Sequence, residues 1–237
     1  MGTTRRRVGR PRAEQRPDRG LTPRAELLDA AAELFTTRGY AATTTRAVAE
    51  RAGMRQATMY HYVAGKEDLL AELLESTVTP SLTLARRLLE RDTEPAERRL
   101  RELCRSDVEL LCGGVHNLGA LYLLPEVRAE RFAGYRRIRG ELKGKYGQLI
   151  ARTETGARLD PGGLALRTDL VFGLIEGVIL IHRSDPERPV EAFAQATAEA
   201  ALRIAGVSDC ECRAVGGEGV AVREGVAVRE TELPPLA

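Results

Sequence analysis

The sequence contains no tryptophan, and aromatic residues make up only 4% of its 237 positions. Leucine, valine, isoleucine and alanine must therefore form most of any core. Long apolar runs are also missing, since the longest, residues 170–181, is interrupted by Glu176. A membrane span needs roughly 20 apolar residues, so this run predicts a buried helix and no membrane partner.

Cysteine and histidine are scarce, with four and three copies. No apolar export signal follows the arginine-rich start, so we expect reduced thiols and a cytoplasmic location. Cys210 and Cys212 offer only two neighbouring thiols, whereas structural zinc takes four ligands, so we expect no metal and no cofactor. The sequence also lacks a Gly-rich phosphate loop, a nucleophile elbow and a paired metal motif, and therefore offers little for an enzyme.

Charge is divided unevenly along the chain. Residues 1–66 carry 13 Lys+Arg against 6 Asp+Glu, a net charge of +7, although the whole chain carries only +2. The remainder is therefore acidic, with a net charge of −5. A basic end on an acidic body indicates two separate roles, and the basic end suits a polyanion.

Residues 22–66 predict three short helices. Thr22 and Pro23 have the pattern of an N-cap followed by proline in the first turn, and Gly39 suits a left-handed helix end. The run "TTT" offers a second N-cap, and Gly53 supplies a tight turn before a third helix that starts near Arg55. Two short helices joined by a turn containing glycine are typical of the helix-turn-helix motif.

The third helix carries the side chains "QATMYHY". The second helix of a helix-turn-helix lies in the DNA major groove, so Gln56 and Thr58 can bond base edges while Tyr60 and Lys66 reach phosphates. A solvated polar face is the alternative, above all for His61. The charge division and the turn spacing favour DNA binding.

Residues 24–70, with "AAELF", "RGYAATTT", "VAERAGM", "ATMYHYV" and "GKEDLL", strongly resemble the DNA-binding domain of the TetR family of bacterial transcriptional regulators. One departure is Val63-Ala64, where many members carry an aromatic and a polar residue. By this resemblance the DNA-contacting residues are Thr45, Arg46, Gln56, Thr58, Tyr60, His61 and Lys66.

The arginine-rich start, residues 1–21, has no apolar period and is expected to be an unstructured arm. Its Gly-Arg-Pro core, with Arg10 and Arg12, resembles an AT-hook, an extended peptide that lies in the DNA minor groove. A solvated basic tail is the alternative.

Residues 67–206 show helical periods and no alternating strand pattern, so the fold class is all-α. One long basic helix is expected from Glu126 towards Arg152. We expect a basic arm at 1–21, a helix-turn-helix DNA-binding domain at 22–66, a helical ligand-binding and dimerisation domain at 67–206, and a tail at 207–237. The tail contains a six-residue repeat, "GVAVRE", and is expected to be disordered, with a small hairpin as the alternative.

The last two predicted helices resemble a dimer interface, since the first is apolar nearly all round and has glycines four apart. TetR-like proteins dimerise through such a pair, and ordinary intrachain packing is the alternative. The interface residues we expect are Leu170, Gly173, Leu174, Gly177, Val190, Phe193, Ala194, Thr197 and Ala201.

The same resemblance implies a ligand cavity in the helical body. Its candidate polar lining is His116, Asn117, Tyr122, Tyr135 and Glu176, although each of these can instead be a surface or capping residue. The sequence thus predicts a homodimeric, ligand-responsive regulator of a palindromic double-stranded DNA operator, acting as a repressor that a small-molecule effector releases. The alternatives are activation, a thiol sensor that uses Cys104 and Cys112, or a helical enzyme with a DNA-binding module.

Overall fold

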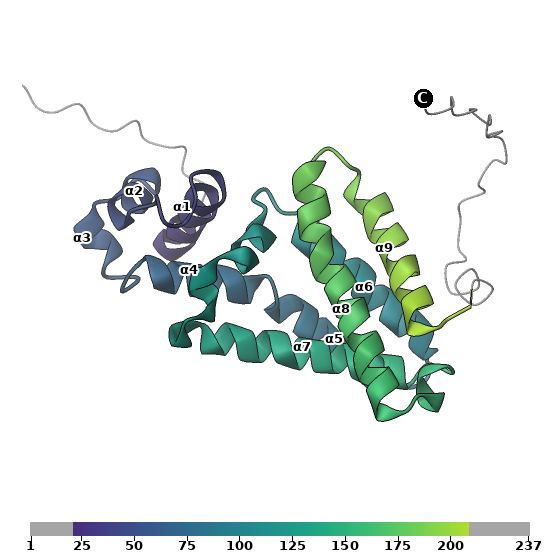
Figure 1. Cartoon of the computed structure of the whole chain (residues 1–237). Coiled ribbons are helices and arrows are strands. Elements are labelled where there is room, and N and C mark those ends of the chain that lie inside the picture. The colour runs from purple at the N-terminus through teal and green to yellow at the C-terminus, as the bar shows by residue number, and fades with distance from the viewer. Residues whose placement is uncertain (1–20, 209–237) are drawn as a thin grey trace, which may run out of the picture.

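A computed structural model describes residues 21–208 of the chain (Figure 1). The described part is helical throughout and contains no strand, which confirms the all-α prediction. Its α-helices are α1 (Pro23–Thr37), α2 (Thr45–Arg51), α3 (Gln56–Met59), α4 (Lys66–Ser76), α5 (Thr79–Glu90), α6 (Ala96–Cys112), α7 (Ala133–Ala151), α8 (Pro161–Ser184) and α9 (Val190–Ala205). Its 3-10 helices are η1 (Leu118–Leu123), η2 (Pro125–Arg128), η3 (Glu130–Phe132) and η4 (Gly156–Arg158).

Helix starts follow the local signals in the sequence. The Thr22 side chain accepts a hydrogen bond from the Ala25 amide, and Thr44 accepts one from Ala47 at the start of α2. Each bond satisfies one amide that the first turn of a helix leaves without a partner. Asp160 caps α8 in the same way, which shows that these three boundaries are determined by local sequence.

Two glycines make the turns of the helix-turn-helix. Gly39 follows α1 with a φ of 89°, and Gly53 lies between α2 and α3 with a φ of 76°. Both values lie in the left-handed region, which costs an L-residue with a side chain roughly 1–2 kcal/mol. The predicted roles of both glycines are confirmed.

The first three helices form a small unit at one end of the molecule, and α4 connects it to the helical body (Figure 1). The third helix is shorter than the sequence pattern predicts, since it ends at Met59 and continues as a turn. Met59 and Val63 are nevertheless both buried, as predicted for its inner face. In the body, α6 contacts α5, α7, α8 and α9 and so lies at its centre.

The long helix expected from Glu126 begins instead at Ala133, after three successive 3-10 helices. Leu121, Val127 and Phe132 are all buried, and they are spaced six and five positions apart. A continuous α-helix turns 100° per residue and cannot place such positions on one face. The irregular backbone therefore lets all three side chains reach the core.

The body also extends slightly past its predicted end. Gly206 adopts a left-handed φ of 94° and ends α9, and Val207 then folds back so that its amide donates to the Leu202 carbonyl. Val207 is buried, so it belongs to the helical body and not to the tail. Within residues 21–208, no helix combines the length and apolarity that a membrane span requires.

A buried polar cluster connects three helices of the body. Asp107 on α6 accepts hydrogen bonds from Ser81 Oγ of α5 at 2.7 Å and from the Tyr146 hydroxyl of α7 at 2.8 Å. Burial raises the pKa of the Asp107 carboxyl to about 6. Cys104 lies beside this cluster, and burial raises the pKa of its thiol as well.

Candidate DNA interface and ligand pocket

Side chains from both helices of the helix-turn-helix meet at the protein surface. Gln56 Nε2 donates to Thr45 Oγ1 at 2.9 Å and lies 3.4 Å from the Tyr60 hydroxyl. The Thr45 and Tyr60 hydroxyl oxygens are 3.3 Å apart. Hydrogen bonds with Thr45 and then Gln56 lower the pKa of the Tyr60 phenol. We call Thr45, Gln56 and Tyr60 the surface triad.

The other predicted DNA contacts surround the triad. Thr58 and His61 are exposed, and Tyr60 is half exposed. Arg46 is exposed and pairs with Glu50 of its own helix at 2.9 Å. An exposed ion pair of this kind is weak, so Arg46 can exchange its partner for a phosphate at little cost.

Lys66 has a role that sequence reasoning missed. Its ammonium donates to the carbonyl oxygens of Tyr40 and Thr43, each at 3.1 Å, and lies 4.4 Å from the centre of the Tyr40 ring. Burial raises the pKa of Tyr40 to about 12. Lys66 thus joins the start of α4 to the α1–α2 connection, and one of its three N–H donors is left for a phosphate.

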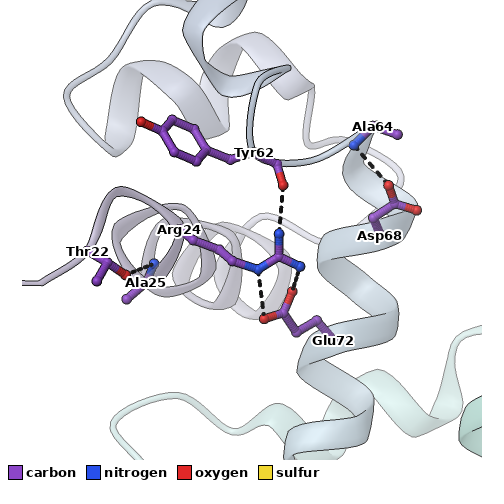
Figure 2. Close-up of polar contacts among 7 residues, drawn as sticks. All are labelled: Thr22, Arg24, Ala25, Tyr62, Ala64, Asp68 and Glu72. Atoms are coloured by element: carbon purple, nitrogen blue, oxygen red, sulfur yellow. Dashed lines mark hydrogen bonds and ion pairs between the residues drawn. The ribbon is translucent and has the colours of Figure 1, made fainter.

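The backbone after the surface triad is held from two sides (Figure 2). Arg24 of α1 donates to the Tyr62 carbonyl at 2.6 Å and forms a two-bond ion pair with Glu72 of α4. Asp68 of α4 accepts a hydrogen bond from the Ala64 amide at 2.9 Å. We call Arg24, Glu72 and Asp68 the loop clamp, because together they position the segment that follows α3 against α1 and α4.

An Arg24→Ala substitution should lower DNA affinity by roughly fivefold, because losing a charge-assisted pair costs about 1 kcal/mol and loosens the Tyr62 backbone. The slope of log affinity against log salt should stay unchanged, since no phosphate contact is removed. Losing a phosphate contact would change that slope by about 0.9. Arg38→Ala, which removes the same charge from an exposed position of the same unit, serves as the control. Unchanged amide exchange at residues 60–64 in the Arg24 variant would contradict the clamp.

The loop clamp also reaches the helical body. Arg131 of η3 donates to Asp68 Oδ1 at 3.0 Å, while the other oxygen of Asp68 binds the Ala64 amide. Nearby, His116 Nε2 lies 3.6 Å from Asp29 of α1. The segment from residue 116 to 132 therefore contacts two helices that position the DNA-binding surface.

The same segment forms one wall of a cavity of about 600 Å³ between η1, η2, α7 and α8. Three of the predicted ligand residues, Tyr122, Tyr135 and Glu176, line it together. His116 and Asn117, which were also predicted, are not part of this lining, and His116 lies beside Asp29 of α1 instead. The full lining is Tyr122, Leu123, Leu124, Pro125, Val127, Arg128, Tyr135, Arg136, Arg139, Glu176, Gly177, Ile179 and Leu180.

The polar groups deep in the cavity are already paired. Arg139 and Glu176 form a two-bond ion pair, with Arg139 Nε donating to Glu176 Oε1 at 2.5 Å, and this bond raises the pKa of Arg139. The Tyr122 hydroxyl lies 2.5 Å from Thr77 Oγ1. Burial raises the pKa of both Tyr122 and Tyr135, so both phenols are neutral at pH 7. Sequence reasoning missed the three cavity arginines because a basic helix resembles a solvated one.

The structure corrects part of the predicted dimer interface. Phe193, Ala194, Thr197 and Ala201 of α9 are buried within the chain, because α9 packs this face on α6 and α8. Leu174 and Val190 are partly buried and also pack against the chain's own core. These six residues are therefore not an outward surface of the single chain.

The apolar outward surface lies on α8. Leu170 and Gly173 are exposed as predicted, and a Cβ added at Gly173 or Gly177 would meet no atom of the chain within 4 Å. These positions continue a row at alternating spacings of four and three, the spacing of a helix that packs along another helix. We call this row the α8 stripe, and its members are Leu166, Leu170, Gly173 and Gly177.

The thiols of α6 do not resemble a sensor. Cys104 and Cys112 are both free and buried, and burial raises the pKa of Cys112 to about 11. Buried thiols with raised pKa values react slowly, because the thiolate is the reactive form. The predictions for Arg10, Arg12, Cys210, Cys212 and the C-terminal repeat lie outside the described residues.

Comparison with known proteins agrees with this geometry. Residues 27–73 match the model of "Bacterial regulatory proteins, tetR family". The crystal structure of AmtR from Mycobacterium smegmatis is 44% identical, with a TM-score of 0.74, over 85% of this chain and 95% of that chain. The repressor KstR2 of Mycobacterium tuberculosis is 37% identical over 75 residues, which are 32% of this chain and only 38% of KstR2. AibR, solved with isovaleryl coenzyme A and operator DNA, shares the fold at 18% identity, with a TM-score of 0.63, over 76% of this chain and 97% of that chain.

A helix-turn-helix unit with a polar surface triad, carried on a helical body that encloses a cavity, defines a class of DNA-binding proteins with a separate ligand-binding domain. The match to AmtR extends over nearly the whole of that protein and includes both parts. The chain belongs to the tetR family of bacterial regulatory proteins.

Proposed function

We propose that this protein is a transcriptional repressor that binds a palindromic double-stranded DNA operator as a homodimer and is released by a small-molecule effector. The observation that carries the proposal is the surface triad, because Thr45 and Gln56 come from the two helices of the motif and present hydrogen-bonding groups together at one exposed surface. Their intrachain bonds orient these side chains before DNA arrives.

The residues divide by what they can contact. Gln56 can form two hydrogen bonds with adenine in the major groove, and Thr58 can bond a neighbouring base. Tyr60, Arg46 and the remaining donor of Lys66 suit phosphates, which fix the position of the protein without reading sequence. Thr45 and His61 complete this surface, and Arg10 and Arg12 extend it into the minor groove. The operator of a bacterial regulator lies on DNA in the cytoplasm, so we propose a cytoplasmic location for the protein.

Dimerisation through the α8 stripe would bring two such surfaces together. An apolar row along an outer helix favours burial against a second copy of itself, since a two-fold axis places the same surface on both sides. In such a dimer the two recognition helices would meet half-sites about 34–36 Å apart, or a multiple of this distance.

The 3-10 segment gives the effector a route to the DNA surface. Tyr122 and Arg128 of this segment line the cavity. Arg131 of the same segment donates a hydrogen bond to Asp68 of the loop clamp. A ligand that moves this segment would move α4 and change the distance between the two recognition helices. A coupling free energy of about 1–3 kcal/mol is typical of such changes. AibR, which shares this fold, was solved with isovaleryl coenzyme A and operator DNA, and so offers a precedent for a ligand and an operator on the same fold.

We also propose that the protein is not an enzyme. The acidic group of the cavity, Glu176, is held in a two-bond ion pair with Arg139, and the two tyrosines are neutral. A general base needs a free basic atom within reach of a substrate proton, and this arrangement offers none at the deep end of the cavity.

Selection of bound duplexes from a randomised pool should yield a palindrome for the wild type, and Gln56→Ala should lose base preference at one position in each half-site. We expect an affinity loss of about 1–3 kcal/mol at the selected operator, the cost of one good base contact. Tyr60→Phe should instead weaken binding to all sequences alike, because it loses a phosphate contact. Selection that returns no enriched sequence would reject the proposed function, and an unchanged preference in the Gln56 variant would reject its assigned role.

A further inference from the structure

Two arginines of the cavity lining, Arg128 and Arg136, come together at the 3-10 wall of the cavity. Arg136 Nη1 donates to the carbonyls of Val127 and Ala129, at 2.8 and 2.6 Å. These carbonyls belong to the residues on either side of Arg128, so the Arg136 guanidinium lies against the backbone that carries Arg128. Both side chains line the cavity, and Arg128 is exposed.

Neither charge is fully neutralised. In the part of the chain that the structure describes, Arg128 forms no ion pair. Arg136 Nη2 lies 3.7 Å from Glu130 Oε2, beyond hydrogen-bond distance, and the Glu130 side chain is 96% exposed. An ion pair of this kind contributes little and is easily exchanged. The third arginine differs, because Arg139 is engaged by Glu176. The lining therefore carries an excess of positive charge at one place.

Five further residues of the lining are aliphatic. Leu123, Leu124 and Val127 come from the 3-10 segment, and Ile179 and Leu180 come from α8. Leu123 and Leu180 are more than half exposed, so a ligand in the cavity would remove their surface from water. Burying such a surface stabilises binding by roughly 25 cal/mol per Å². The cavity combines an aliphatic surface with two arginines that no close carboxylate neutralises.

We propose that the effector is an organic anion with an aliphatic portion, whose carboxylate or phosphate binds Arg128 and Arg136 while its chain lies on Leu123, Val127 and Leu180. This inference rests on the proposed effector role of the cavity. Arginine forks match the oxygen atoms of carboxylates and phosphates, and two adjacent forks would hold one anionic group from both sides. The Arg139–Glu176 pair stays intact and leaves the deep end without net charge.

The test uses the full chain and four probes with the same eight-carbon chain: octanoate, octyl phosphate, 1-octanol and octylammonium. Calorimetric titration should show that at least one of the two anions binds ten times more tightly than 1-octanol, and that octylammonium binds most weakly. Comparison of octanoate with octyl phosphate identifies the head group. Inorganic phosphate alone should bind far more weakly than octyl phosphate, because it lacks the aliphatic contact.

Two variants locate the anion site. Arg128→Gln should reduce the preference for the anion over 1-octanol at least threefold, and the Arg128→Gln, Arg136→Gln double variant should reduce it to within twofold of unity. Since Arg136 also holds two carbonyls, the single variant remains informative if the double variant unfolds. Arg137→Gln is the matched control, because Arg137 is the neighbour of Arg136 on α7 but lies outside the cavity lining.

Equal binding of 1-octanol and both anions, or an anion preference that survives in Arg128→Gln, would overturn the inference. So would the absence of anion binding in a wild-type protein that still selects its operator, and in that case the proposed regulatory function stands. A protein that binds the anions but selects no operator would give the reverse result: the ligand class would be correct and the proposed function would be wrong.

Discussion

A Leu170→Arg variant is expected to be monomeric and to lose about 10²–10⁴-fold in operator affinity, the gain that linking two binding sites ordinarily provides. Leu170 is 52% exposed and lies in the middle of the α8 stripe. In a two-fold dimer that buries this stripe, an arginine there would bring like charges from both copies into the interface. The fold of the single chain should survive, because the outer half of this side chain contacts no core. Gly173→Arg should act in the same way.

Sedimentation at micromolar concentration measures the association state, and binding to the selected operator measures the affinity. Val115→Arg is the matched control, because Val115 is 96% exposed and lies outside the α8 stripe. We expect the control to remain dimeric and to bind its operator normally. A dimer that tolerates both Leu170→Arg and Gly173→Arg would assign the interface to another surface, and the α8 stripe would then need another explanation.

An Asp107→Asn variant is expected to be more stable than the wild type at pH 7.5, by an amount on the order of 1–3 kcal/mol. Burial raises the pKa of Asp107 to about 6, whereas an unfolded chain ionises this group near 3.8. Between these two values the folded protein holds a proton that the unfolded chain has released. The stability that this group contributes is therefore fully present below about pH 4 and is lost as the pH rises through 6. Asparagine avoids this loss because it carries no charge.

The amide can still accept a hydrogen bond from Tyr146 or Ser81, the two donors that Asp107 engages. Thermal unfolding at pH 7.5 and at pH 4 separates the effect of the Asp107 charge from that of the changed hydrogen bonds. The variant should be more stable than the wild type at pH 7.5 and should gain no stability at pH 4. Asp185→Asn neutralises an exposed carboxylate and should show no such difference. A variant that is less stable than the wild type at both values would show that the charged form of Asp107 is favoured in the fold.

The position of this carboxyl gives a further reason to test it. Asp107 lies with Tyr122, Arg139 and Glu176 around a small gap next to the ligand cavity. Polar groups that a sequence retains in a core against stability often serve a site, and this one borders the cavity that we assign to the effector.

Local interactions explain why the helices and turns of residues 22–66 could be predicted from sequence. Thr22, Thr44, Gly39 and Gly53 act within four residues of their own position, so a reader of the sequence sees both partners of each interaction. The surface triad joins residues only 4 to 15 positions apart, and the motif brings them together in a fixed way. By contrast, Lys66 bonds carbonyls 23 and 26 positions away, and Arg24 bonds Glu72 across 48, which no local pattern reveals.

The apolar face of α9 shows a second reason why sequence alone was insufficient. An apolar stripe predicts that a helix buries one face, but burial against the same chain and burial against a partner have the same free energy per area. Phe193, Ala194 and Ala201 fit either interpretation, and only their position against α6 shows that they belong to the chain's own core.

The sequence by itself determined the all-α class and the starts of several helices, because caps, turn glycines and helical periodicity act over a few residues. Tertiary structure decided where the cavity lies, which arginines border it, which helix remains apolar on its outer side, and how the body is connected to the DNA-binding unit. These features depend on side chains that are distant in sequence, such as Arg131 and Asp68, and packing brings them together only when the whole core has formed.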